Sequence, residues 1–201
     1  MSNKKIVALF VEGATEIEFY KAIIKYSRDS MEMPFNCIFE WIDMGGIGNY
    51  KKDALRKFNL LRKKYPHDDI YALLCIDTDV FQFSKKPPVD RRAVKTAIQE
   101  AGAKKVYYIE AEHSIEDWFL VDFDGVISYL GLPKSTKRPK GMGQEVLKKL
   151  FKDAKKIYVK GHNTGEFIKN LDIGKIMTAY CNQLKTLCRI AELNCKYVCK
   201  K

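Results

Sequence analysis

The sequence predicts an α/β fold in which a mostly parallel sheet of about four strands is flanked by helices. Up to Ile109, short apolar segments rich in β-branched residues alternate with segments that have the periodicity of amphipathic helices. This order is typical of βαβ units, whose strands lie parallel and are covered by helices on both faces. We therefore expect an α/β domain over residues 1–125 and a basic, mainly helical extension over residues 126–201 that packs on it.

Four segments are expected to form the strands, because each is short, apolar and bounded by turn-forming or charged residues. In chain order they are Ile6–Val11, Phe35–Met44, Ile70–Ile76 and Lys105–Ile109. Gly13 follows the first of them and permits a sharp turn. Thr15 and Glu18 then have the spacing of a capping box, which predicts the start of the first helix.

The other helices are placed by caps and by apolar periodicity. Tyr50–Tyr65 should form a basic amphipathic helix. Its inward-facing residues should be Leu55, Phe58, Leu60 and Leu61. Asp90 is the expected N-cap of the next helix, which should end near Ala101. Later helices are expected at Ser114–Leu120, Phe123–Leu130, Gln144–Ala154 and Ile173–Leu193.

Basic residues outnumber acidic ones, with 36 Lys and Arg against 25 Asp and Glu and a formal net charge of +11. The excess is concentrated between Lys134 and Lys160, where ten basic residues meet two acidic ones. A solvated helix face is one explanation, and a polyanionic partner such as nucleic acid is the other. The candidate nucleic-acid-binding residues are Lys134, Lys137, Arg138, Lys140 and Lys160.

No apolar run reaches the ~18 residues of a membrane span, so no membrane association is expected. Basic residues precede the first apolar run, but that run is only about six residues long, shorter than the ~7–15 of a signal peptide. We expect a cytoplasmic protein, in which the six cysteines are free thiols. The charge leaves the oligomeric state open.

Carboxylates follow two of the apolar strands directly. Glu12 ends the first strand, and Asp77 and Asp79 end the third. Glu16 lies in the first turn of the following helix, and Glu116 follows the fourth strand. Each has an ordinary explanation as a helix cap, a turn residue or a charge that complements a helix dipole. Together they predict a cation site, because the carboxyl ends of parallel strands meet at one edge of the sheet.

These segments resemble a known family. ValGluGlyAlaThrGlu, from Val11 to Glu16, followed by the strand end AspThrAsp, resembles the Toprim domain of topoisomerases, primases and several nucleases. The form Glu-Gly-x-Thr-Glu is most similar to the branch that contains OLD-family nucleases and small RloB-like proteins. Ser114, Glu116 and Trp118 after the fourth strand, and the late lysine Lys160, extend the likeness. It covers roughly residues 5–125 well and the remainder loosely.

The resemblance implies a Rossmann-like Toprim fold and one or two Mg²⁺ or Mn²⁺ ions, which oxygen ligands favour over Zn²⁺. It implies these metal ligands: Glu12, Glu16, Asp77 and Asp79, with Ser114 and Glu116 completing a second site. Glu12, Asp77, Asp79 and Lys160 would carry catalysis, with Lys160 stabilising charge on the phosphate.

The function to expect is therefore two-metal hydrolysis of phosphodiester bonds in DNA or RNA, in anti-phage defence or a mobile element. The alternative is a non-catalytic Toprim protein that binds nucleic acid or regulates, acting with a separately encoded ATPase. Strand transfer of the topoisomerase or primase kind is disfavoured, because 201 residues leave little space for the further domain that each requires.

Overall fold

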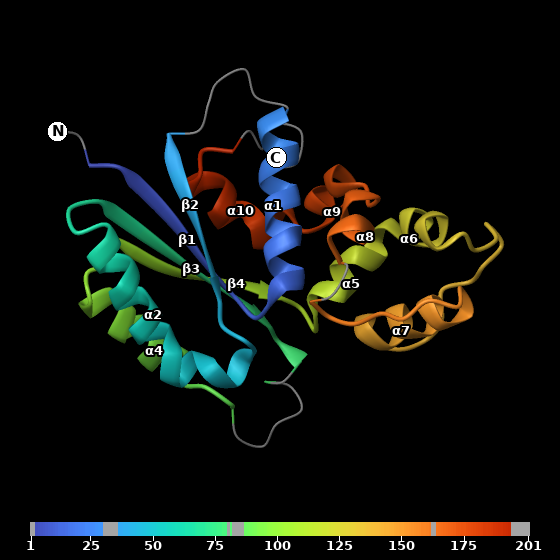
Figure 1. Cartoon of the computed structure of the whole chain (residues 1–201), viewed down its shortest axis with the longest axis horizontal. Coiled ribbons are helices and arrows are strands. Elements are labelled where there is room, and N and C mark those ends of the chain that lie inside the picture. The colour runs from blue at the N-terminus through green and yellow to red at the C-terminus, as the bar shows by residue number, and fades with distance from the viewer. Residues whose placement is uncertain (1–2, 30–35, 80, 82–86, 162–163, 194–201) are drawn as a thin grey trace.

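The computed structural model describes residues 3–29, 36–79, 81, 87–161 and 164–193. Within them, four parallel strands form one sheet in the order β2-β1-β3-β4. The strands are β1 (Lys5–Val11), β2 (Cys37–Asp43), β3 (Asp69–Asp77) and β4 (Lys105–Ala111). Helices flank the sheet on both faces (Figure 1). The predicted α/β class and the parallel sheet are confirmed.

The central strands β1 and β3 are apolar because both of their faces are covered. Every side chain from Ile6 to Val11 is buried, and so is β3 from Ala72 to Asp77. Alternate residues point to opposite faces of a strand. Leu9 therefore belongs to one hydrophobic core and Phe10 to the other.

Different helices cover the two faces. The connection between β1 and β2 contains α1 (Ala14–Asp29), which packs on one face, and α2 (Tyr50–Lys64) and α4 (Arg91–Glu100) pack together on the other (Figure 1). Asp90 caps α4 as predicted, since its side chain accepts a hydrogen bond of 3.0 Å from the amide of Ala93. A short 3₁₀ turn, η1 (Ile47–Asn49), leads into α2.

The chain after β4 is helical and packs on the α1 side of the sheet. Its elements are α5 (Ile115–Phe119), η2 (Leu120–Asp122), α6 (Phe123–Leu130), α7 (Gly143–Asp153), α8 (Thr164–Lys169), α9 (Ile173–Ala179) and α10 (Cys181–Ile190). The Phe119 ring lies 5.3 Å from that of Phe19 in α1 and 5.7 Å from that of Phe167 in α8. Residues on both sides of position 125 thus share one core.

Some placements from the sequence are wrong. Leu55 and Leu60 are 39% and 55% exposed, and Tyr50 and Ala54 lie inward with Phe58 instead, because the buried stripe starts at the first residue of the helix. The helix expected over Ile173–Leu193 is two helices, α9 and α10, separated at Tyr180. The short α8 falls where no helix was expected. The start of the predicted second strand, Phe35, lies outside the described residues.

No helix in the described ranges combines the length and the apolar character needed to cross a membrane. The parallel arrangement has a direct consequence for function. Val11 pairs with Asp43, and Asp77 pairs with Ala111, so the strands end at the same edge of the sheet. The polar residues that follow them are therefore brought together.

Candidate active site

The first two carboxylates from the sequence meet where β1 and β3 end. Glu12 follows the last residue of β1, and its Oε1 accepts a hydrogen bond of 2.9 Å from the backbone amide of Asp77. Asp77 is the last residue of β3 and is 93% buried, with 7% of its surface exposed. Its Oδ1 accepts a hydrogen bond of 3.0 Å from the amide of Ile115 at the start of α5. Both side chains are thus fixed by backbone groups of neighbouring elements.

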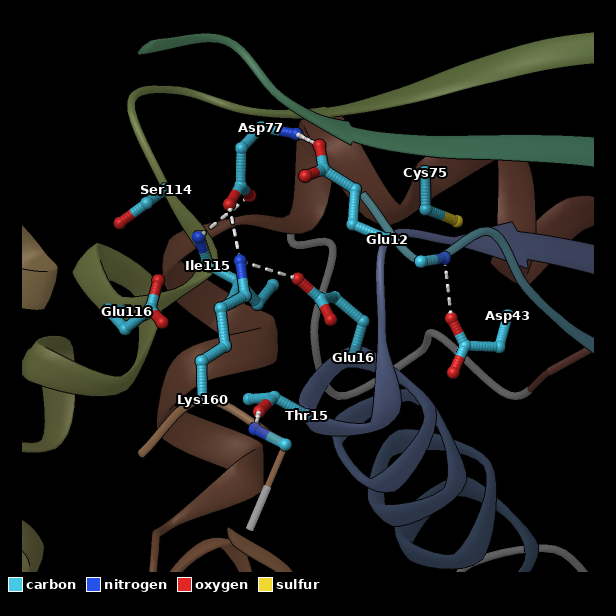
Figure 2. A network of polar contacts seen from close by, with 12 residues as sticks. Glu12, Thr15, Glu16, Asp43, Cys75, Asp77, Ser114, Ile115, Glu116 and Lys160 are labelled. Carbon is cyan, nitrogen blue, oxygen red and sulfur yellow. Dashed lines mark hydrogen bonds and ion pairs between the residues drawn. The ribbon is translucent and has the colours of Figure 1, made fainter. Parts of the chain in front are cut away.

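Lys160 joins this cluster from the far end of the chain. Its Nζ lies 3.0 Å from Oδ2 of Asp77 and 2.9 Å from Oε1 of Glu16 (Figure 2). The segment that carries it is held to α1 by the amide of Gly161, which donates a hydrogen bond of 2.6 Å to Oγ1 of Thr15. Thr15 is the second residue of α1, so it anchors this segment and is not the helix cap that the sequence suggested.

Burial makes the ionised forms of these side chains unfavourable and so shifts their pKa values. Removal from water raises the pKa of Glu12, of Glu16 and of Asp77, the last to about 8, although Lys160 opposes each shift. Burial alone would lower the pKa of Lys160, but the carboxylates of Asp77, Glu16 and Glu116 outweigh it and raise that pKa. One ammonium group therefore faces several carboxylates, and further positive charge would be stabilising here.

Ser114 and Glu116 approach the same place from the start of α5 (Figure 2). Glu116 is 1% exposed, and its Oε1 accepts a hydrogen bond of 3.0 Å from the hydroxyl of Tyr158. Ser114 is the N-cap residue of α5, but its hydroxyl lies 3.0 Å from Oδ2 of Asp117 and caps no backbone amide. Tyr158 thus contributes a hydrogen bond to the cluster, and it was not identified from the sequence.

His113 takes an unusual backbone conformation beside the cluster. Its φ of 63° lies in the left-handed region, which residues other than glycine seldom adopt. Hydrogen bonds of 3.0 Å hold it there, from its own amide to Oγ1 of Thr78 and from the amides of Thr78 and Asp79 to its carbonyl. Its buried Nδ1 has no hydrogen-bond partner in the described part of the chain. Such local strain is common at functional sites.

A pocket of about 130 Å³ opens beside these residues. Its lining comprises Asp77, Asp79, His113, Ser114, Glu116, Met142, Gln144, Glu145 and Lys160. The start of α7 forms one wall, which the sequence did not predict. Gly143 permits this close approach, because a Cβ atom there would lie 2.4 Å from the amide nitrogen of Asp117 in α5. This glycine is the one sequence signal that could have pointed to the wall.

The basic loop leads directly to this pocket. Lys134, Lys137, Arg138 and Lys140 are all exposed, and the loop ends at Met142 in the pocket lining. Two further acids near the end of β4 do not join the cluster. Glu110 pairs with Arg91 of α4 on the other side of the sheet, and Glu112 is exposed outside the pocket lining.

The oxygen atoms of the cluster decide whether it suits a divalent metal ion. Oε2 of Glu16 is buried and has no hydrogen-bond donor among the described residues, which is costly for a carboxylate unless a cation compensates. No three Asp, Glu, His or Cys side chains in the described ranges are close enough to hold a metal ion as they stand. The donors fit Mg²⁺ or Mn²⁺ in kind, and an ion would compete with Lys160 for the oxygens of Glu16 and Asp77.

Comparison with family models, curated proteins and solved structures gives no match for this chain.

Proposed function

We propose that this protein is a Mg²⁺- or Mn²⁺-dependent nuclease of the Toprim type, which hydrolyses phosphodiester bonds in DNA or RNA. The observation that carries the proposal is the cluster of buried carboxylates around Lys160 at the carboxyl ends of parallel strands. Structural ion pairs alone do not require Glu12, Glu16, Asp77 and Glu116 to share one lysine. A surplus of buried negative charge is what a divalent cation site needs.

The chain's own residues would divide the work as follows. Glu12, Glu16, Asp77 and Asp79 would hold the first ion, and Ser114 and Glu116 would contribute to a second. Once bound, the ions would activate water for attack and stabilise the leaving oxygen. Lys160, released from Asp77, would contact a phosphate oxygen and offset its developing charge. The wall formed by Met142 and Gln144 would exclude bulk water and orient the phosphate.

The basic loop supports nucleic acid as the substrate. Lys134, Lys137, Arg138 and Lys140 are exposed on the loop that ends at Met142 in the pocket lining, and they would bind phosphates that flank the bond to be cut. A small phosphate ester would gain little from cations placed outside the pocket. Action in defence or on a mobile element, and an ATPase partner, are part of this proposal by resemblance to the Toprim family.

Cleavage of a mixed panel tests the proposal. Supercoiled plasmid, single-stranded DNA and total tRNA would be incubated with Mg²⁺ or Mn²⁺ and with EDTA. We expect metal-dependent cutting of at least one substrate, and a rate about a thousandfold lower in Glu12→Ala and Asp77→Ala, since metal activation contributes several kcal/mol. Asp77→Asn keeps the shape of the side chain and should be equally inactive.

Glu110→Ala is the matched control. It removes a carboxylate near the end of β4 that pairs with Arg91 and lies outside the pocket lining, so it should cut like the wild type. Cutting that survives in Asp77→Asn would contradict the proposal. The non-catalytic alternative would be favoured if the protein bound nucleic acid without metal, with the same affinity in every variant, and did not cut it. The absence of cutting would have to persist when a purified ATPase partner is added.

A further inference from the structure

A second hollow lies at the opposite end of the same sheet. It has a volume of about 320 Å³ and lies where β1, β3 and β4 begin, next to α10. Its lining includes Lys5, Tyr71, Lys104, Lys105, Tyr107 and Arg189. We call this surface the amino-end hollow. A strand of seven residues separates it from the acidic cluster, a distance of about 20 Å.

The strand register places the key side chains on one face. Tyr71 of β3 pairs with Lys105 of β4, and Tyr107 lies two residues further along β4. Residues two apart share a face, so Lys105 and Tyr107 point to the same side of the sheet. Tyr71 and Tyr107 are only partly buried, which leaves part of each ring accessible. Two aromatic rings and a lysine thus share one accessible patch of the sheet.

Positive charge surrounds these rings. Lys104, Lys105 and Arg189 are exposed, and the guanidinium of Arg189 lies 5.8 Å from the centre of the Tyr107 ring. Two carboxylates offset part of the charge, since Lys5 pairs with Glu192 and Lys104 lies 3.3 Å from Asp69. Surface ion pairs of this kind contribute little, so a polyanion can compete for these lysines.

We propose that the amino-end hollow binds single-stranded nucleic acid. Lys105 and Arg189 bind phosphates, and a base stacks on the ring of Tyr107. Single strands suit this surface because their bases are free to stack on aromatic side chains, whereas a duplex presents mainly its phosphates. The inference rests on the proposed function only in taking nucleic acid as the ligand. It adds a contact remote from the bond that is cut.

Binding in EDTA tests this site without any need for cleavage. Affinity for a fluorescent single-stranded oligonucleotide, as DNA and as RNA, would be measured by anisotropy over a range of salt concentrations. We expect Lys105→Glu/Arg189→Glu to bind about tenfold more weakly. Its log–log salt slope should fall by about 1.4, because each lost phosphate contact removes about 0.7 for single strands.

Lys51→Glu/Lys52→Glu is the matched control, since it makes the same change in net charge at two exposed positions of α2, on the other face of the sheet. It should change the affinity less than twofold. Tyr107→Leu keeps an apolar side chain against the core and should weaken binding about fivefold or more with an unchanged salt slope. Thermal unfolding would verify that each variant is folded.

Three results would overturn this site. If the hollow variant and the α2 control lost affinity equally, the loss would be explained by net charge alone. Equal affinity of the wild type for duplex and single strand, with no loss in Tyr107→Leu, would remove the stacking contact. If the hollow variants bind more weakly but the wild type never cuts, only the proposed nuclease activity is refuted. If the wild type cuts and the hollow variants bind normally, only the proposed binding site in the hollow is refuted.

Discussion

The two ends of the sheet carry opposite charges in opposite surroundings. At the carboxyl ends, Glu16, Asp77 and Glu116 are buried around Lys160, while at the amino ends the cations of the hollow are mostly exposed. Charges in water interact weakly and are screened by salt, whereas buried charges must be neutralised nearby. The comparison teaches that the same four strands can support a buried cluster of charges at one end and a diffuse electrostatic surface at the other.

Removal of the lysine at each end tests this contrast most strongly. Lys160→Met leaves Glu16 and Asp77 buried without their ammonium partner, so the free energy of unfolding in EDTA should fall by about 3–5 kcal/mol. Lys104→Met breaks an exposed pair with Asp69 and should cost about 0–1 kcal/mol. Urea unfolding measures both values.

Mg²⁺ should restore part of the stability of Lys160→Met, because the ion takes over the neutralisation of the same oxygens. Mg²⁺ should leave the difference in free energy of unfolding between Lys104→Met and the wild type unchanged. Equal losses in the two variants would mean that burial does not distinguish the two ends.

The pH dependence of stability should come from the carboxyl end. Burial raises the pKa of Asp77 from 3.8 to about 8, so the folded protein binds this proton more tightly than the unfolded chain. The stability that this adds is full below pH 3.8 and is lost as the pH rises towards 8. The difference in free energy of unfolding between Asp77→Asn and the wild type, in EDTA, should therefore grow over this range. A constant difference would contradict the shift.

A smaller loss of stability should follow from a change in the wall that α7 forms at the pocket. The open amino-end hollow has no such wall. Gly143→Ala places a methyl group 2.4 Å from the amide nitrogen of Asp117, so α7 must shift away from α5. We expect a loss of about 1–3 kcal/mol by urea unfolding and a lower rate of cleavage. Gly48→Ala is the control, since a Cβ atom there meets nothing within 4 Å. If Gly143→Ala cleaved at the wild-type rate, α7 would have no role in catalysis.

The sequence predicts the sheet well, because local signals set it. The apolar runs at Ile6–Val11 and Ile70–Ile76 are almost the observed β1 and β3, and Asp90 caps its helix. It predicts the buried faces of helices such as α2 less well, since packing decides there. Leu60 is as apolar as Leu61, yet only Leu61 faces the core.

The candidate site divides in the same way. Glu12, Asp77 and Asp79 lie at the carboxyl ends of β1 and β3, and a parallel sheet brings them together without further information. The left-handed conformation of His113, the hydrogen bond from Tyr158 to Glu116 and the wall at Met142 depend on contacts between distant segments. No local pattern encodes such contacts, so a single sequence does not reveal them.

The hydrogen bond between Thr15 and Gly161 has a consequence for how the protein is made. It joins residues 146 positions apart, and it fixes the segment that carries Lys160. During synthesis the N-terminal residues emerge first, so Glu12, Glu16 and Asp77 are available long before their counter-charge. Until residue 160 leaves the ribosome, these acids repel one another and resist burial. The acidic cluster can therefore close only after residue 160 has emerged.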